Sequence, residues 1–374
     1  MLEHFIFKLR ESNNNLPMDE KALTQFPIAL PLKEVKALTN GIINTTDLIT
    51  AADGQKYIFQ KINTNIFKNT EGMMKNIYIV TTHIREKAAK SDRDPERATL
   101  HFLPASNNTL LYKNENGAYR VSKYIANTVS FEGKATEKSL EMAGRSFGTF
   151  IKDLSDLDAS LLSETLPNFH NTPMRIAHFL ETVKSNPANR LDSAREDVDY
   201  LISLIDEGSK LSKVKLPLRV THNDTKTSNV LVVKTTLEPL AVIDLDTVMP
   251  GLLCHDFADS IRYSANYVAE DEKEYYRAGL DIDMYKAYAK GFIPAVSSII
   301  TKEEIDTLVQ GVITIVYEQA IRFLDDYLAG DVYYHTQYSE HNLVRTRTQI
   351  GLLRDMLKRR NEMEAIARDP SLYK

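Results

Sequence analysis

The first third of the chain alternates short apolar runs with turn-forming residues, a pattern typical of β-strands. Residues 47–50 and 57–62 read as two strands, and Ala52-Asp53-Gly54 between them predicts a hairpin turn, since Asp-Gly accepts the positive φ that such turns need. Two further strands are predicted at 109–113 and 118–125, on either side of a turn at 114–117. A small sheet is therefore expected before residue 125.

Helical spacing appears once within this region. Apolar residues at Met73, Met74, Ile77, Val80 and Ile84 recur every three or four positions, which predicts a helix over 70–90. A short helix is also expected at residues 1–9. Strands with one longer helix among them make a small α+β lobe over residues 1–125.

Beyond residue 125 the strand signal is scarce and helical spacing dominates. The predicted helices span 137–157, 192–205, 283–292, 302–328 and 342–368, the last with a strongly charged, solvated face. A chain of 374 residues is long for one core and suits two domains. The expected fold class is α+β and bilobal, with a small β-rich lobe (1–125) and a larger, mainly helical lobe (126–374).

Composition limits the classes of partner. The net charge of −5 argues against a nucleic-acid binder, and no apolar run approaches the ~20 residues of a membrane span. The first residues lack the pattern of a secretory signal, and the single Cys254 excludes an internal disulfide or a cysteine-based zinc cluster. We therefore expect a cytoplasmic protein without membrane or nucleic-acid partners, and no protein partner is inferred.

Candidate chemistry is concentrated in residues 218–246. A short strand leads to His222-Asn223-Asp224, Asn229 follows, and a strand at 230–233 precedes one at 240–245 that ends in Asp244-Leu245-Asp246. If these strands pair as hairpins, three carboxylates converge, and their repulsion is relieved by raised pKa values or by a cation. Oxygen ligands without thiols favour Mg²⁺ over zinc. The alternative is that these side chains only cap turns.

The spacing H-x-D-x₄-N, from His222 to Asn229, resembles the catalytic loop of protein kinases and of the aminoglycoside, choline and homoserine kinase superfamily. Asp244 lies in a local I-D-x-[DE] pattern of that superfamily. Longer runs over residues 38–358 resemble the bacterial N-acetylhexosamine 1-kinases: NGIINTTDLIT, YIFQKINTNIF, NFHNTPMR, RVTHNDTK, VIDLDTVMPG, DFADSIR, RFLDDYLAGDVYY and EHNLVRTRTQI.

The resemblance implies a kinase-like bilobal fold, with ATP and Mg²⁺ as cofactors and an N-acetylhexosamine as substrate. Asp224 would take the proton of the sugar's anomeric hydroxyl, and Asn229 and Asp244 would hold Mg²⁺. His222 would pin the loop, while the role of Asp246 stays open between indirect metal support and orientation of the loop. The residues implied for ATP are Gly41, Asn44, Thr45, Thr46, Gln60, Tyr124 and Ile125.

This sequence departs from the superfamily at the phosphate anchor. Gln60 stands where most relatives carry a phosphate-pairing Lys, and Lys61 comes one residue later, on the opposite face of the strand. Glu71 is the candidate for the helix acid that would pair with such a lysine. Ile42 replaces a His of the N-acetylhexosamine kinase motif.

The sugar site is expected in the helical lobe, because a hexosamine needs fixed polar groups and an aromatic wall. The implied residues are Asp224, Arg322, Tyr333, Tyr263, Thr247, His170 and Arg175. Asp259 and Arg262 are further candidates, although Arg262 can instead pair with Asp256 or Asp259. The expected product is N-acetyl-α-D-hexosamine 1-phosphate, from GlcNAc or GalNAc. The alternatives are a kinase of another small alcohol (an aminoglycoside, choline or a methylthiopentose) and an inactive nucleotide-binding module.

Overall fold

The computed structural model describes residues 18–38, 43–131 and 133–373. The predicted helix at 1–9, Gly41 and Ile42 lie outside the described residues. The chain divides into two units that are each discontinuous in sequence. Unit 1 combines residues 1–129, 160–166 and 232–249, and unit 2 combines 130–159, 167–231 and 250–374.

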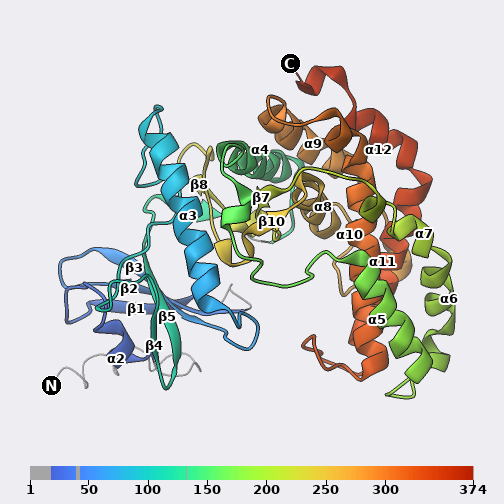
Figure 1. The fold of residues 1–374 in the computed structure, drawn as a ribbon, viewed down its shortest axis with the longest axis horizontal. Coiled ribbons are helices and arrows are strands. Elements are labelled where there is room, and N and C mark those ends of the chain that lie inside the picture. Colours follow the sequence, from blue (N-terminus) through green and yellow to red (C-terminus); the bar gives the residue numbers. More distant parts are fainter. Residues whose placement is uncertain (1–17, 39–42, 132, 374) are drawn as a thin grey trace. The chain divides into compact units, whose positions relative to one another are not determined.

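Unit 1 is built on an antiparallel sheet, as the alternating pattern predicted (Figure 1). Its strands, in spatial order, are β1 (Glu34–Leu38), β2 (Thr45–Thr50), β3 (Lys56–Ile62), β5 (Gly117–Lys123) and β4 (Tyr112–Asn114). The hairpin turn between β2 and β3 is confirmed, with Gly54 at a φ of 87°. The strand predicted at 109–113 begins later, at Tyr112, and β1 was not predicted.

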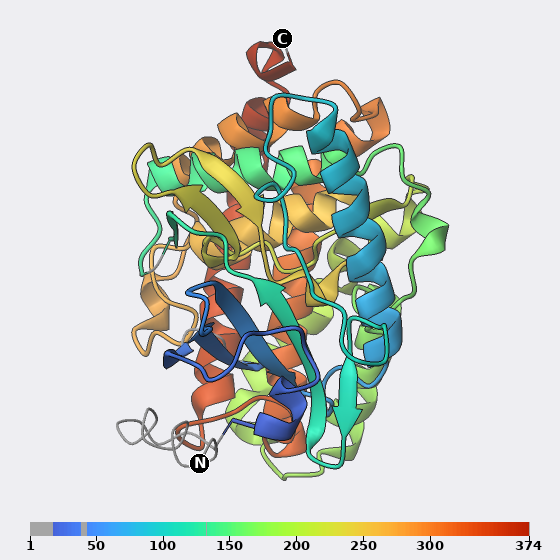
Figure 2. The same ribbon diagram turned by 90° about the vertical axis from the view of Figure 1, so that its left-hand side faces the viewer.

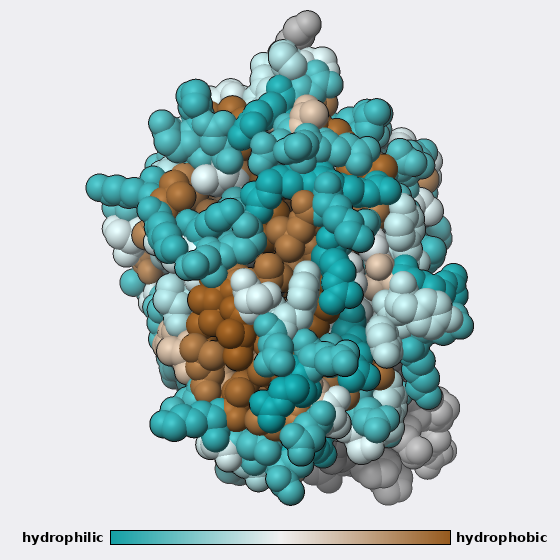
Figure 3. All heavy atoms as spheres, turned by 90° about the vertical axis from the view of Figure 1, so that its right-hand side faces the viewer, coloured by the Kyte–Doolittle hydropathy of each residue, from teal (hydrophilic) through white to brown (hydrophobic). Residues whose placement is uncertain are grey.

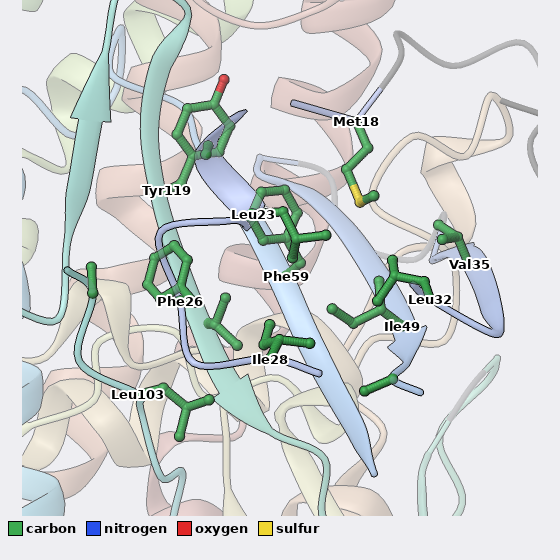
Figure 4. Packing of buried hydrophobic residues seen from close by; sticks show 14 residues of the cluster. Met18, Leu23, Phe26, Ile28, Leu32, Val35, Ile49, Phe59, Leu103 and Tyr119 are labelled. Atoms are coloured by element: carbon green, nitrogen blue, oxygen red, sulfur yellow. The ribbon is translucent and has the colours of Figure 1, made fainter. Parts of the chain in front are cut away.

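The core of this unit lies on one face of the sheet. Phe59 of β3 and Tyr119 of β5 stack with their ring centroids 5.6 Å apart, and both side chains are almost fully buried. Residues before β1, among them Leu23 and Phe26, pack on the same cluster (Figure 4). The short helix α2 (Glu20–Leu23), which Asp19 caps, belongs to this segment.

The long helix α3 (Thr70–Ala89) also belongs to unit 1 (Figure 2). Asn69 caps its first turn, and the five apolar residues that predicted the helix are all buried. Its second anchor is polar. Asn76, at 0% exposure, donates hydrogen bonds to the backbone oxygens of Ser163 and Val248, at 2.8 and 2.9 Å. The sequence spacing therefore located the helix, while Asn76 ties it to residues far along the chain.

Unit 2 is mainly helical. Its helices are α4 (Glu137–Asp153), α5 (Thr172–Ser185), α6 (Arg195–Ser203), α7 (Ile205–Gly208), α8 (Leu253–Ser264), α9 (Ile282–Val296), α10 (Lys302–Ala329), α11 (His341–Lys358) and α12 (Arg360–Ala367). Helix α10 starts in a capping box formed by Thr301 and Glu304 and ends at Gly330, whose φ is 97°. Because almost every residue of its central turns is buried, α10 forms the core of this unit.

Several helix predictions needed correction. The helix expected at 342–368 is two helices, because the backbone leaves helical geometry at Arg359 (φ −96°, ψ 11°). Residues 191–194 form a 3₁₀ turn before α6, so the helix expected from 192 starts at Arg195. The expectation for 137–157 ends earlier, at Asp153. Helices α5 and α8 were not predicted.

Helices α4 and α9 pack closely enough to require glycine at their crossing. A Cβ atom on Gly291 would lie 1.9 Å from the backbone oxygen of Glu141, and one on Gly144 would lie 2.4 Å from the backbone oxygen of Tyr288. Side chains at either position would force the two backbones apart.

The strands around the catalytic motif pair differently from the prediction. Strand β8 (Val230–Val233) neighbours β9 (Pro239–Val242) in a sheet of order β6-β8-β9, with β6 at Thr128–Ser130, so that hairpin is confirmed. Strand β7 (Arg219–Thr221) pairs instead with β10 (Met249–Gly251), and the expected β7–β8 hairpin is wrong. The strand predicted at 240–245 ends at Val242, because Leu245–Thr247 forms a 3₁₀ turn, η5.

The surface on the side of α5–α7 is mostly hydrophilic, with a patch of apolar side chains exposed among polar ones (Figure 3). Exposed apolar residues on or near these helices include Leu180, Ile202 and Leu218. Within the described residues, no helix has the length and apolar character needed to cross a membrane.

Candidate active site

The loop after β7 is held by one buried carboxylate of α8. Asp256, at 0% exposure, accepts hydrogen bonds from the backbone N–H groups of His222 and Asn223, both at 2.7 Å. Asn223 has a φ of 62°, so the chain turns sharply here. Burial raises the pKa of Asp256 to about 6, although His222 and the two backbone donors act in the opposite direction. The loop is therefore held by a carboxyl group whose ionised form is disfavoured by burial.

The surroundings of His222 agree with the pinning role that was expected of it. Its ring is fully buried and meets the rings of Phe147 and Phe150 edge-on, at 5.3 and 5.8 Å. Its Nδ1 accepts the backbone N–H of Asp224 at 3.3 Å. The ring thus packs against aromatic side chains and also bonds the backbone of the loop.

Asp224 carries the partly exposed carboxylate of the loop. Lys226 Nζ lies 2.9 Å from its Oδ1, and Asn229 Nδ2 donates to its backbone oxygen at 2.9 Å. Burial lowers the pKa of Lys226, but the attraction of Asp224 outweighs it and the net pKa is raised. The ammonium group of Lys226 and the side-chain amide of Asn229 thus both contact Asp224.

Tyr263 lies beside this pair. Lys226 Nζ is 5.8 Å from the centre of its ring, and the ring is about half exposed. The neighbouring Arg262 forms ion pairs with Asp259 at 3.1 Å and with Glu270 at 2.5 Å, which is the structural pairing considered for it. Burial raises the pKa of Asp259, yet the charges of Arg262, Lys226 and His170 together outweigh this and the net pKa is lowered.

A second group of predicted residues gathers around α10. Glu318, 2% exposed, accepts from Thr172 Oγ1 at 2.5 Å and lies 3.0 Å from His170 Nδ1. The ring of His170 is 4.4 Å from that of His255, whose pKa burial lowers to about 3. His170 Nε2 and His255 Nδ1 are buried and have no hydrogen-bond partner among the described residues.

Arg322 and Arg175 both contact Phe169, the first at its ring and the second at its backbone oxygen. The guanidinium of Arg322 lies 5.7 Å from the ring centres of both Phe169 and Tyr334, and Arg175 Nε donates to the backbone oxygen of Phe169 at 3.0 Å. Burial lowers the pKa of Arg175, and the charge of Arg322 lowers it further. Tyr333, which is 68% exposed, packs edge-on against Tyr334 with centroids 4.8 Å apart.

The two groups within unit 2 are electrostatically continuous. His170 contributes to the lowered pKa of Asp259, and Glu270 contributes to the raised pKa of Tyr334, which burial dominates. The contacts in unit 2 thus form two groups of predicted residues. One contains Asp224, Asn229 and Tyr263, and the other contains His170, Arg175, Arg322 and Tyr333.

Unit 1 contains a polar network around the predicted nucleotide residues. Gln60 Nε2 donates to Thr46 Oγ1 at 3.0 Å, and Gln60 Oε1 accepts from Arg120 Nε at 2.9 Å. Arg120 Nη1 and Nη2 donate to the two oxygens of Asp246, at 2.5 and 3.0 Å. Asn44 Nδ2 donates to Asp246 Oδ2 at 2.7 Å. Asp246 is therefore an anchored, buried side chain.

The other predicted residues of unit 1 lie around this network or along the chain after β5. Thr45 opens β2 on its exposed side, and Thr247 ends η5 half-buried. The backbone N–H of Tyr124 donates to the oxygen of Lys56 at 3.0 Å, and the oxygen of Ile125 accepts from Thr128 Oγ1 at 2.7 Å. The Ile125 oxygen can accept a second hydrogen bond, because a carbonyl oxygen has two lone pairs.

The two predicted metal ligands fit a hard cation by their chemistry. Asp244 is exposed, and its backbone adopts a left-handed conformation with φ 60° and ψ 57°. The side-chain nitrogen of Asn229 donates to Asp224, so its side-chain oxygen points away from Asp224. Among the described residues no cluster of three or more His, Cys, Asp or Glu side chains could hold a metal. Mg²⁺ typically takes only one or two carboxylates, completed by phosphate oxygens, so the chemistry of each of these side chains by itself suits the ion.

Three residues that the sequence analysis missed are charged side chains in buried surroundings. Arg120 stands in a strand of otherwise buried residues, and Glu318 stands in the apolar centre of α10. Lys226 follows Asp224 by two positions. For Arg120 and Glu318 the available signal was a charge within a mostly apolar run, because such charges are rarely buried without a partner.

Comparison with known proteins places these features in context. Residues 34–290 match the sequence model of a family described as the phosphotransferase enzyme family. An aminoglycoside phosphotransferase from Alicyclobacillus acidocaldarius is similar in structure, with a TM-score of 0.62 and 14% identity over 95% of this chain and 99% of that one. A spectinomycin phosphotransferase in complex with ADP and spectinomycin has a TM-score of 0.55 and 12% identity, over 96% and 100% of the two chains. A choline kinase from Cryptosporidium parvum has a TM-score of 0.53 and 13% identity, over 100% and 99%. At these identities the likeness concerns the fold.

Proposed function

The chain belongs to the phosphotransferase enzyme family, and on that premise we propose that it is an ATP-dependent anomeric kinase. It converts an N-acetylhexosamine, GlcNAc or GalNAc, into N-acetyl-α-D-hexosamine 1-phosphate. Residues 1–125 form the nucleotide-binding lobe in this proposal, and 126–374 form the catalytic and sugar-binding lobe. The similar spectinomycin phosphotransferase, crystallised with ADP, supports an adenine nucleotide as the phosphoryl donor.

The reacting residue of the proposal is Asp224. Its carboxylate accepts the proton of the anomeric hydroxyl while the sugar oxygen bonds to the γ-phosphorus and the bond from that phosphorus to ADP breaks. A positioned base of this kind contributes ~10²–10⁴-fold to the rate. Lys226, 2.9 Å from the carboxylate, offsets the charge of the base in the free enzyme.

Asn229 and Asp244 hold Mg²⁺ in this proposal, and the ion supplies charge that offsets the phosphate oxygens. The nucleotide phosphates are placed near Gly41, Asn44, Thr45, Thr46 and Gln60, with the adenine beside Tyr124 and Ile125. Asp246 orients the loop that carries Asp244, which its hydrogen bonds to Arg120 and Asn44 support.

The observation that carries the substrate class is the pair of arginines in unit 2. Arg322 lies close enough to Arg175 to lower its pKa, so the positive potential here disfavours a polycation such as an aminoglycoside. A neutral sugar suits the same surface. Its hydroxyls and amide can bond His170, Arg175 and Arg322, and its apolar face can rest on Tyr263 or Tyr333, with Thr247 beside the N-acetyl group.

The experiment measures ADP release with Mg·ATP in the presence of GlcNAc, GalNAc, ManNAc, glucose, galactose, choline or kanamycin. Turnover with the N-acetylhexosamines supports the proposal, and turnover confined to choline or kanamycin overturns the sugar assignment. Asp224→Asn should abolish turnover without altering the circular dichroism spectrum, whereas Asp192→Asn, at a fully exposed carboxylate, should leave the rate unchanged. A normal rate in Asp224→Asn would remove that residue as the base.

A further inference from the structure

Arg120 is the buried cation at the centre of unit 1, and neither the motif nor the resemblance assigned it a role. It lies on β5, directly opposite Gln60 of β3 in the strand register. Gln60 occupies the position where the sequence lacks the usual strand lysine. The positive charge is thus present, but it comes from the neighbouring strand.

The guanidinium of Arg120 is enclosed and satisfied by the protein. Its Nε donates to Gln60, its Nη1 and Nη2 donate to Asp246, and Nη1 also lies 3.7 Å from the sulfur of Met74. Arg120 is 3% exposed and Asp246 is 2% exposed. Because each planar edge already has a partner, Arg120 does not present itself to a nucleotide phosphate.

The other residues that the motif offered for this role are engaged elsewhere. Glu71 pairs with Lys113 at 2.5 Å, and both side chains are largely exposed. Lys61 alternates with Gln60 along β3 and therefore lies on the other face of the strand. Unlike the exposed pair of Lys113 and Glu71, the ion pair of Arg120 with Asp246 is buried, and it ties β5 to the segment that carries Asp244.

The segment held by this ion pair begins with a strained residue. Asp244 adopts left-handed backbone angles, which are unfavourable for a residue other than glycine and persist only where the surroundings enforce them. Asp246 follows two positions later, in the same 3₁₀ turn, and is held bidentately by Arg120 and by Asn44. Asn44 is itself fixed, since its Oδ1 accepts the backbone N–H of Asn63 at 2.9 Å.

We infer that Arg120 is a positioning residue, which acts through Asp246 to hold Asp244 in the conformation that presents its carboxylate to Mg²⁺. The inference rests on the proposed function, since it concerns the metal of that same site. In this chain Arg120 on β5 fixes the loop from Asp244 to Asp246, and other groups contact the nucleotide phosphates. The same network joins Asn44, and Thr46 of β2, to this loop.

The test uses binding of a fluorescent ATP analogue to the full chain as a function of Mg²⁺ concentration, with no sugar present. Arg120→Met and Asp246→Asn should raise the Mg²⁺ concentration for half-maximal binding by about 10–100-fold, the usual loss when a partner of a metal ligand is removed. Arg120→Lys should recover part of this loss. Nucleotide binding without metal should change by less than about 2-fold in each variant, because Arg120 does not contact the phosphates.

Two further variants make the outcome decisive. Lys113→Met removes an exposed ion pair of the same sheet and should bind as the unaltered protein does. Arg120→Met combined with Asp246→Leu removes both charges, so it should fold where a single variant leaves an unpaired buried charge. It should still show the weakened Mg²⁺ dependence.

An unchanged Mg²⁺ dependence in a folded Arg120 or double variant would overturn the inference. Loss of metal-free nucleotide binding in Arg120→Lys would also overturn it, since that result assigns Arg120 to the phosphates. If the unaltered protein itself shows no Mg²⁺-dependent nucleotide binding, the proposed function fails instead. Thermal unfolding of each variant establishes which proteins are folded.

Discussion

The substitution Asp256→Asn should raise the stability of the protein near neutral pH and lower its turnover. Asp256 is fully buried on α8, and its two oxygens accept the backbone N–H groups of His222 and Asn223. Asparagine has the same shape as aspartate but only one acceptor oxygen. Its NH₂ group therefore faces one of the two backbone N–H groups that Asp256 binds. The catalytic loop therefore loses one of its two charge-assisted hydrogen bonds.

The size of the stability effect follows from the pKa of Asp256, which burial raises from 3.8 to about 6. Between those values the folded protein binds more protons than the unfolded chain, so stability falls as pH rises. The contribution of Asp256 is fully present below the unfolded pKa and is lost as the pH rises through the folded pKa. A shift of about 2 units corresponds to ~3 kcal/mol.

Near pH 4 the protonated aspartic acid and the asparagine are both neutral, and the two proteins should be about equally stable. At about pH 7.5 the asparagine variant should be more stable by ~2–3 kcal/mol, because it carries no buried charge. Turnover should nevertheless fall by about 5–150-fold, which corresponds to ~1–3 kcal/mol for the N–H left without an acceptor.

Urea unfolding of both proteins across this pH range measures the stability difference, and ADP release measures turnover. Asp192→Asn makes the same chemical change at a fully exposed carboxylate and serves as the control. A stability difference that does not vary with pH would refute the raised pKa of Asp256. A variant with unaltered turnover would refute its role in holding the loop.

Three other perturbations have defined outcomes. Lys226→Met should lower turnover by about 10²-fold in the ADP-release assay, because the cation beside Asp224 is lost, and exposed Lys210→Met should not. Glu318→Gln should destabilise the protein by about 3 kcal/mol in urea unfolding, since His170 loses its buried partner; a loss below about 1 kcal/mol would contradict this pairing. Gly291→Ala should lower the unfolding free energy by ~3 kcal/mol or more, because its Cβ meets backbone 1.9 Å away, and an unchanged melting temperature would show that α4 and α9 can separate.

Local patterns in the sequence were sufficient for the regular elements. The apolar spacing of α3 and α10 located both helices to within about two residues, because the helical period acts between near neighbours. The hairpin of β2 and β3 was equally readable from its Asp-Gly turn. The break at Arg359 was not, since a charged helix surface carries no signal of where one helix stops and the next begins.

The motif H-x-D-x₄-N identified Asp224 and Asn229 as a unit, and the structure shows the hydrogen bond that joins them. It also supplied the reading of His222 as a pin. The residues that support the motif could not be read in the same way. Asp256 lies more than thirty positions along the chain from the loop that it holds, and the partner of β7 is β10 and not the strand that follows it.

Arg120 shows most clearly what only the tertiary structure decided. In the sequence it is a charge within an apolar strand, and its partner Asp246 lies 126 positions away. Burying a guanidinium is favourable only where a carboxylate meets it with matched geometry, and that match is created by the packing of distant segments. Local period and motif chemistry could therefore be read from the sequence, whereas the pairing of buried charges depended on contacts that exist only after the chain has folded.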